Sequence, residues 1–306
     1  MNFKKIFRIF TSLFLLLSLT LALAGCGAEG KADSPAGPSA AAAGAKSTGG
    51  MLTLRMLDIG QGDSFLLEKN GQFVLIDSGD IEHRAALTKL LRQYGVKEIS
   101  KVIITHPHED HLGGMAAVFK NFSVGAVYDN GVSTNTGSYR NYLKTIQSKK
   151  IPYHTLKAGE SLELFPGVSF DVLGPVSLIR DSKGKPDQNN NSIVGRMSYG
   201  SFSVMFSGDA EKEEESAVLK KGGTFASTVL KSGHHGSRTS SSAAWLRAVS
   251  PKTALISCGL DNSYGHPHKT VLDRYAKANI QVYRTDRNGT VTVTSDGSSY
   301  KIEKEH

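Results

Sequence analysis

The chain has 306 residues, with 36 basic and 28 acidic side chains, a formal net charge of +8 and 39% hydrophobic residues. This composition is that of a globular protein long enough to bury a full core, and it excludes wholesale disorder. Two cysteines exclude both a multi-bridge disulfide scaffold and a zinc cluster made of cysteine alone. The ten histidines are more informative, because seven of them fall in three short groups: His106, His108 and His111; His234 and His235; His266 and His268.

The N-terminal segment, residues 1–25, has the pattern of a lipoprotein signal peptide. Three basic residues precede an uncharged apolar run at residues 9–24. A transmembrane helix is the alternative, because the run approaches spanning length. The run ends in Leu23-Ala24-Gly25-Cys26, which resembles a bacterial lipobox. We therefore expect cleavage before Cys26, lipidation of its thiol, and a protein anchored to the outer face of the cytoplasmic membrane.

Residues 26–50 predict a lipid-anchored flexible linker. From residue 27 to residue 50, 20 of the 24 residues are Ala, Gly, Ser, Thr or Pro, and none is a large apolar residue. Such a composition cannot build a core. A single folded domain is therefore predicted at residues 51–306.

Within this domain, short apolar runs alternate with amphipathic segments. Strands are predicted at residues 51–57, 64–68, 73–77 and 101–105, and helices at residues 83–94, 113–121 and 138–149. Several strands are expected between residues 153 and 173, followed by a hairpin at residues 193–199 and 202–207. The rest of the pattern predicts helices at 210–221, 243–249 and 270–278, and strands at 228–231, 253–257, 281–284, 290–294 and 299–302. This alternation predicts helices layered on sheets.

The strongest functional signal is Thr105-His106-Pro107-His108-Glu109-Asp110-His111, which follows an apolar strand. Imidazoles and carboxylates crowded in this way are hard to explain by packing, because buried polar groups need partners. A divalent cation provides such a partner. His106 and His108 are two residues apart and can share one metal. Asp110 and His111 come next, just before the helix predicted from residue 113, and would face a second metal. A solvated polar loop is the alternative.

Two further segments end apolar strands in the same way. In Phe206-Ser207-Gly208-Asp209, the aspartate is placed either to bridge two cations or to cap the helix that follows. In Ser232-Gly233-His234-His235-Gly236, neighbouring side chains on an extended segment diverge. We therefore expect one histidine to bind metal and the other to support it or to contact substrate.

Taken in order, these residues resemble the metallo-β-lactamase superfamily, which combines a His-x-His-x-Asp-His loop with a strand-end Asp and a strand-end His. The motifs at residues 56–64, 190–194, 207–211, 233–237 and 264–267 are similar to the C-terminal hydrolase domain of the competence protein ComEC. The similarity covers about residues 51–300. It implies an α/β fold, specifically a single-domain αββα four-layer sandwich, with two metals in a cleft at one edge.

The resemblance implies a ligand set shared by two divalent metal ions: His106 and His108 on the first, Asp110 and His111 on the second, and Asp209 between them. One histidine of the pair His234 and His235 completes the second site, with His235 favoured. Many superfamily members carry a further histidine where this chain has Asn189-Asn190-Asn191-Ser192. The first metal is therefore expected to have fewer protein ligands. Zinc is the expected metal, and manganese is the alternative.

Two cations about 3.5–4 Å apart lower the pKa of a shared water and stabilise charge on substrate oxygens. That chemistry suits hydrolysis of a phosphodiester, a carboxylic ester or a lactam, with Asp110 and Asp209 as proton acceptors. His266 is a candidate general acid or substrate ligand, and its alternative role is that of a turn histidine. Substrate contacts are expected from four other residues: Asp63, Asn191, Ser237 and Lys231.

The leading hypothesis is a membrane-anchored, extracytoplasmic phosphodiesterase or nuclease that acts on an anionic substrate, DNA above all, by metal-activated hydroxide. The alternatives are a hydrolase of another extracellular ester, such as a phosphocholine or cell-envelope ester, and a non-catalytic lipoprotein that captures DNA. Four tyrosines are candidates for base stacking, although each is expected to serve as core or surface filler: Tyr139, Tyr142, Tyr199 and Tyr264. The sequence identifies no protein partner.

Overall fold

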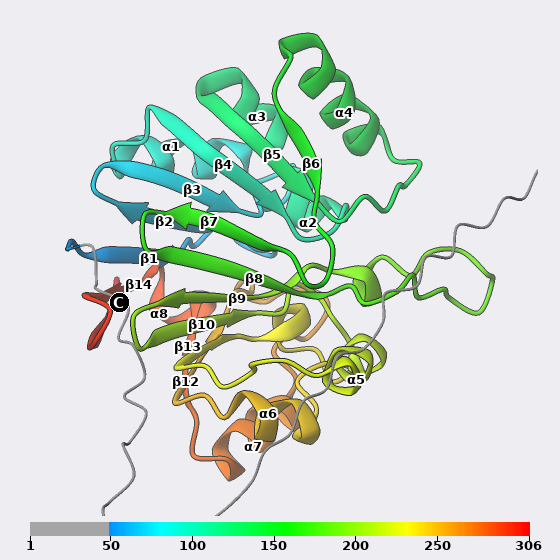
Figure 1. Ribbon diagram of the computed structural model, residues 1–306, viewed down its shortest axis with the longest axis vertical. Coiled ribbons are helices and arrows are strands. Elements are labelled where there is room, and N and C mark those ends of the chain that lie inside the picture. The colour runs from blue at the N-terminus through cyan, green and yellow to red at the C-terminus, as the bar shows by residue number, and fades with distance from the viewer. Residues whose placement is uncertain (1–48) are drawn as a thin grey trace, which may run out of the picture. The chain divides into compact units, whose positions relative to one another are not determined.

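The strands of the domain form two sheets that lie face to face (Figure 1). The computed structural model describes residues 49–306. The predicted signal peptide, Cys26 and nearly all of the predicted linker lie outside these residues. Among the described residues, no helix is both long enough and apolar enough to cross a membrane.

Sheet A joins the beginning of the domain to its end. In order across the sheet, its strands are β15 (Tyr300–Lys304), β14 (Val291–Ser295), β1 (Leu52–Met56), β2 (Phe65–Lys69), β3 (Gln72–Ile76), β4 (Glu98–Ile104), β5 (Ser123–Asp129) and β6 (Tyr153–Thr155). Strands β3 to β6 are parallel, and the other pairs are antiparallel.

Sheet B comes from the middle of the chain. In order, its strands are β13 (Gln281–Arg284), β12 (Thr253–Ile256), β11 (Val229–Lys231), β10 (Phe202–Phe206), β9 (Val194–Tyr199), β8 (Val168–Gly174) and β7 (Ser161–Phe165). Strands β10 to β13 are parallel, whereas β7 to β10 are antiparallel. The predicted hairpin is confirmed as β9 and β10.

Helices cover the outer face of each sheet (Figure 1). Over sheet A lie α1 (Arg84–Gln93), α3 (Met115–Asn121) and α4 (Gly137–Lys149), and over sheet B lie α5 (Lys212–Lys221), α6 (Ala243–Val249) and α7 (Lys269–Lys277). The remaining helical elements are short: α2 (Glu109–Leu112), α8 (Thr285–Asn288) and the 3₁₀ turns Asn189–Asn191 and Gly233–Gly236. The predicted αββα sandwich is confirmed.

Three apolar layers hold the sandwich together, because successive residues of a strand face opposite sides of its sheet. In β2, Phe65 and Leu67 lie between the two sheets, whereas Leu66 packs under the helices of sheet A. Phe65 and Phe206 meet edge to face between the sheets, with ring centroids 5.5 Å apart. Because Phe206 ends β10, this contact fixes the point where the loop carrying Asp209 begins.

The predicted elements agree with the structure to within a few residues, with three exceptions. The pattern predicts no element at β5, α2 or α8. In β5, Gly125 interrupts the apolar run, and a Cβ atom at this position would lie 2.6 Å from the carbonyl oxygen of Ser100 in β4. A strand is formed there because the adjacent strands supply its hydrogen bonds, and this contribution is invisible to a local pattern.

Candidate metal centre

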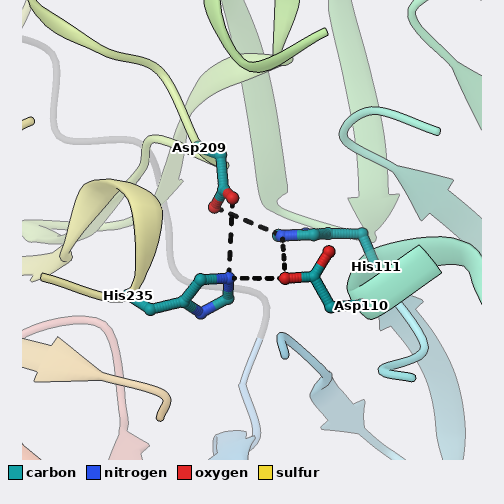
Figure 2. A group of neighbouring side chains, drawn as sticks. All are labelled: Asp110, His111, Asp209 and His235. Carbon is teal, nitrogen blue, oxygen red and sulfur yellow. Dashed lines mark ion pairs between the residues drawn. The ribbon is translucent and has the colours of Figure 1, made fainter. Parts of the chain in front are cut away.

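The candidate site forms where parallel strands from both sheets end. The loops after β3 and β4 in sheet A meet the loops after β10, β11 and β12 in sheet B. Carboxyl ends of parallel strands share one edge of a sheet, so the side chains that follow them converge. Figure 2 shows Asp110 and His111 from α2, Asp209 after β10, and His235 after β11 directed toward one another.

Asp209 lies at the centre of this cluster. Its Oδ1 atom is 3.2 Å from His111 Nε2, and its Oδ2 atom is 3.5 Å from His235 Nε2. Asp110 Oδ2 is 3.2 Å from His235 Nε2 and 4.0 Å from His111 Nε2. One ligand atom from each of these four residues lies within 4.8 Å of all the others.

Several of these atoms are buried without a hydrogen-bond partner among the described residues: His111 Nε2, His235 Nε2 and Asp209 Oδ1. Buried polar atoms left unpaired are rare because they are costly. Imidazole nitrogens and carboxylate oxygens are the donors that divalent transition metals accept. This donor set therefore fits a divalent cation.

A second set of imidazoles approaches the same carboxylate. His106 Nε2 and His234 Nε2 are each 3.8 Å from Asp209 Oδ2. His108 Nδ1 is 3.1 Å from His106 Nε2, as the spacing of two residues predicts. Asp209 thus faces imidazoles on both of its oxygen atoms, which places it to join two ligand sets.

The backbone at His234 and His235 is not extended, and the prediction that their side chains diverge is wrong. Both residues have left-handed backbone angles, with φ of 47° and 52°. Their Nδ1 atoms are held by Glu211 Oε1 at 3.0 Å and by the Ser257 carbonyl oxygen at 2.9 Å, respectively. Both Nε2 atoms therefore face Asp209, and both histidines remain candidate ligands.

His111 is oriented by Asp77, the first residue after β3. Asp77 Oδ2 accepts a hydrogen bond from His111 Nδ1 at 2.7 Å, and the same carboxylate accepts from the backbone N–H and the hydroxyl of Thr105, each at 2.7 Å. Such an outer hydrogen bond fixes the tautomer of a ligating imidazole. It leaves His111 Nε2 directed at Asp209.

Asp63 and Lys231 form a buried ion pair behind the histidines. Lys231 Nζ contacts Asp63 Oδ2 and donates to the Gly208 carbonyl oxygen at 2.8 Å, and Asp63 Oδ1 is 3.3 Å from His235 Nδ1. Each residue is only 1% exposed. The predicted substrate contacts of Asp63 and Lys231 therefore do not hold, because the lysine turns inward to neutralise buried carboxylates.

Asn191 and Ser237 are also buried and hydrogen-bonded within the protein. The buried Asn191 amide donates to the carbonyl oxygens of Ile179 and Asp187 and accepts from the Ile179 N–H, so it anchors the preceding loop. Ser237 is buried, and its hydroxyl pairs with that of Thr239 at 2.9 Å. Neither side chain lines the cavity, and their predicted substrate contacts do not hold.

A cavity of about 360 Å³ opens beside the cluster. Asp110, Asp209, His234 and His235 line it together with Gln61, Glu109, Asn189, Tyr264 and His266. His266 is nearly buried, and its Nδ1 atom has no hydrogen-bond partner among the described residues. A larger hollow of about 410 Å³ between α6 and α7 contains none of the histidines, so the smaller cavity is the candidate active site.

Burial and mutual charge set the protonation of the cluster. Burial raises the pKa of Asp209, but the neighbouring imidazoles of His111 and His235 lower it well below its ordinary value. Burial lowers the pKa of His111, but Asp209, Asp77 and Asp110 together raise it well above the ordinary value. A cation entering the cluster would displace protons from such imidazoles, so metal affinity is expected to rise with pH.

The pKa of His266 is lowered, in contrast to that of His111. Burial and the neighbouring imidazoles of His235 and His234 lower it to about 4. Asp209 opposes this effect only in part. His266 is therefore a neutral imidazole near pH 7.

The backbone around Asp209 is supported from the 3₁₀ turn before β9 and from α5. Ser192 Oγ accepts a hydrogen bond from Asp209 N at 3.0 Å, and Ser192 N donates to Glu214 Oε2 at 3.1 Å. Asn190 Oδ1 accepts from the N–H groups of Glu211 and Glu214 in the first turn of α5. Asn190 thus caps α5, and the alternative role of Asp209 as helix cap is wrong.

Two glycines permit the close backbone approach that the loops need. Gly62 has φ of 125°, and a Cβ atom there would lie 2.4 Å from the Asp110 carbonyl oxygen. At Gly114 the corresponding distance to the Ser78 carbonyl oxygen is 2.0 Å. These contacts hold α2, and with it Asp110 and His111, against the loops that follow β1 and β3.

The sequence patterns missed several supporting residues: Glu211, Glu214, Ser192 and Ser257. Each acts through a partner on another loop, often more than 20 residues away, and a local pattern carries no record of such a contact. Glu211 gave a weak signal, because it lies in the strand-end motif that contains Asp209.

Comparison with known proteins finds a family and several proteins that the chain resembles. The model of the metallo-beta-lactamase superfamily matches residues 57–260. ComE operon protein 3 of Bacillus subtilis (strain 168) is 31% identical over 255 residues, which cover 77% of this chain and 32% of that protein. Competence protein ComA of Neisseria gonorrhoeae is 33% identical over 236 residues, with coverage of 76% and 31%. The chain thus spans about a third of the length of these curated relatives.

A solved structure shares the fold. The metallo-beta-lactamase fold protein YhfI from Bacillus subtilis matches with a TM-score of 0.53 at 11% sequence identity. The match covers 83% of this chain and 99% of that one. At this identity the likeness concerns the fold alone.

The buried carboxyl group of Glu214 makes the stability of the folded protein depend on pH. Burial raises the pKa of Glu214 well above its ordinary value, so the folded state keeps a proton that the unfolded chain loses above about pH 4.3. Stability from this group is complete at lower pH and is lost as pH rises through the raised pKa. Glu214→Gln should therefore become more stable relative to wild type as pH rises, by up to about 1.4 kcal/mol per pH unit.

Urea unfolding of both proteins between pH 5 and pH 8 measures this difference. Glu213→Gln is the matched control, because Glu213 is exposed on the same turn of α5. A difference between Glu214→Gln and wild type that is constant over this range would show that Glu214 is already ionised in the folded protein.

Proposed function

The chain belongs to the metallo-beta-lactamase superfamily, and we propose that it is a dinuclear metal-dependent phosphodiesterase that hydrolyses nucleic acid at this centre. The observation that carries the proposal is Asp209, a buried carboxylate with imidazoles facing both of its oxygen atoms. This arrangement suits a bridge between two cations, which is the basis of two-metal hydrolysis of phosphate esters.

We assign the ligands by proximity: one donor atom each of Asp110, His111 and His235 lies within 4.8 Å of the others and of Asp209. The remaining imidazoles beside Asp209 form the other set. The first cation would be held by His106, His108 and His234, the second by Asp110, His111 and His235, and Asp209 would contact both. His234 then supplies the ligand that the segment Asn189–Asn191 lacks. Zinc is the expected ion because nitrogen and oxygen donors are mixed, and manganese is the alternative.

Bound divalent cations would lower the pKa of a water molecule and neutralise the charge that builds on phosphate oxygens. The protein's own residues supply position. Asp77, Ser257 and Glu211 hold three imidazoles by their Nδ1 atoms, so the Nε2 atoms converge. His266, neutral at pH 7, is proposed to form a hydrogen bond with a substrate oxygen rather than to deliver a stored proton.

Charge near the cavity and the named relatives favour a nucleic acid substrate. Arg238 is exposed and donates to His268 Nε2 at 2.9 Å, and Lys269 is also exposed. Both side chains lie close in the chain or in space to His266, where they can meet phosphates. One relative is named a competence protein.

We also propose that lipidated Cys26 anchors the protein to the outer face of the cytoplasmic membrane. The support is the sequence alone: a basic start, an apolar run and the lipobox-like Leu23-Ala24-Gly25-Cys26. The substrate would then be extracytoplasmic nucleic acid.

Metal content tests the ligand assignment. The wild-type protein should hold two metal ions per chain, measured by mass spectrometry of the purified, dialysed protein. His234→Asn should reduce this to about one, because the first cation loses one of its imidazoles. His154→Asn, a change at an exposed histidine of β6, is the control and should retain two. Two tightly held ions in His234→Asn would remove His234 from the ligand set.

Hydrolysis of a substrate panel tests the function. We expect the protein to cleave bis-p-nitrophenyl phosphate and DNA, and a chelator to stop both reactions. Loss of a residue that only supports a metal ligand lowers activity by about 10- to 100-fold. Asp209→Asn should lower the rate by more than this, because Asp209 is proposed to bind both metal ions. Glu303→Gln, at an exposed site on β15, should leave the rate unchanged. Turnover of a phosphocholine ester, a carboxylic ester or a cephalosporin without cleavage of DNA would reject the nuclease. DNA binding without turnover would favour a capture protein.

Labelling with a radioactive fatty acid tests the anchor. Wild-type protein should incorporate label and fractionate with membranes, whereas Cys26→Ala should do neither or remain as uncleaved precursor. Cys258→Ala is the matched control, because that thiol is buried in the domain and should not be acylated. A processed Cys26→Ala protein that is still retained at the membrane would contradict lipid anchoring.

A further inference from the structure

We propose that Tyr264 is a stacking platform for one base of single-stranded nucleic acid beside the metal centre. The inference rests on the proposed function, because it names the part of the substrate that lies next to the hydrolysed bond. Of the four tyrosines that the sequence offers for stacking, Tyr139, Tyr142 and Tyr199 are buried in the core. Tyr264 is 64% exposed and lines the same cavity as Asp110 and Asp209.

The position of Tyr264 is unusual among the exposed apolar side chains. Over residues 49–306, the other large hydrophobic residues with high exposure lie outside this cavity: Met51, Tyr153, Val176, Leu178 and Leu260. An aromatic ring left in water costs hydrophobic free energy that burial elsewhere would recover. Exposure at the mouth of a polar cavity therefore points to a ligand that covers the ring.

The loop that carries Tyr264 is held in one conformation. Asn262 Nδ2 donates to the carbonyl oxygens of Gly259 at 2.9 Å and of His266 at 2.6 Å, and Asn262 Oδ1 accepts from His266 N at 2.9 Å. The rings of Tyr264 and His266 are stacked, with centroids 5.6 Å apart and planes inclined by 21°. The ring is thus positioned before the ligand arrives, so little entropy is lost on binding.

The neighbouring chemistry suits a base joined to a phosphate. Nucleobases stack on aromatic side chains because every base has a π face. His266 lies between Tyr264 and the imidazoles of His234 and His235, with ring centroids 5.4 and 6.2 Å from theirs. A base on the outer face of Tyr264 would therefore be one short backbone segment from the metal centre. Bases in a duplex are already stacked on both faces, which favours a single strand.

Binding of two oligonucleotides tests this subsite. The probes are a fluorescein-labelled oligothymidylate with a phosphorothioate backbone that slows cleavage, and an abasic strand of equal length and backbone. Dissociation constants are measured by fluorescence anisotropy at one salt concentration with the metal-loaded protein. Tyr264→Ala should weaken binding of the base-containing strand by about tenfold and change binding of the abasic strand less than twofold.

Two matched variants separate stacking on the ring from hydrogen bonding by the hydroxyl and from a general change in the loop. Tyr264→Phe keeps the ring and loses the hydroxyl, so it should bind both strands as wild type does. Leu260→Ala removes another exposed side chain of the same loop that does not line the cavity, and it should also match wild type.

Three outcomes would overturn the proposal. These are equal losses for the two strands in Tyr264→Ala, a loss in Tyr264→Phe as large as in Tyr264→Ala, and a protein that binds neither strand. Base-dependent binding in a protein that cleaves no phosphodiester would reject the proposed hydrolysis and leave the stacking subsite standing. The two proposals therefore fail by different measurements.

Discussion

The centre depends on the neutralisation of carboxylates that are buried in the loops where the two sheets meet. Asp63, Asp77 and Asp209 are almost completely buried, and isolated charges in such a place are destabilising by several kcal/mol each. Lys231 compensates Asp63, and His111 contacts both Asp77 and Asp209. The left-handed turn at His234 and His235 and the close approach at Gly62 bring further partners to the same carboxylates. The left-handed turn and the close approach each strain the backbone locally. They are maintained because the buried carboxylates need these partners.

Neither sheet contains the site alone. Sheet A contributes Asp110 and His111 after β4, and sheet B contributes Asp209 and the paired histidines after β10 and β11. The central apolar layer, with Phe65 against Phe206, therefore sets the distance between the two halves of the cluster. A change in packing between the sheets would alter the metal centre without touching a ligand.

Much of the fold and the outline of the site could be predicted, because both leave local patterns. Apolar runs indicated the strands. The histidine loop after β4 and Asp209 after β10 could be predicted as functional because α/β folds present functional groups at strand ends. Side-chain direction could not be predicted in the same way. Lys231 reads as a substrate contact until the buried Asp63, distant in sequence, turns it inward. The role of Asn191 likewise depends on tertiary partners, because its amide binds the carbonyl oxygens of Ile179 and Asp187.

The pairing of β1 with β14 affects the order in which the domain folds. Leu52 lies opposite Ser295, so the first strand finds one of its two neighbours only near the end of the chain. Contacts between such remote segments slow folding, because a long loop must close before they form. As the chain grows, one side of β1 stays unpaired until β14 has been made. The sandwich, and the cluster that needs both of its sheets, is therefore complete only once β14 has been made.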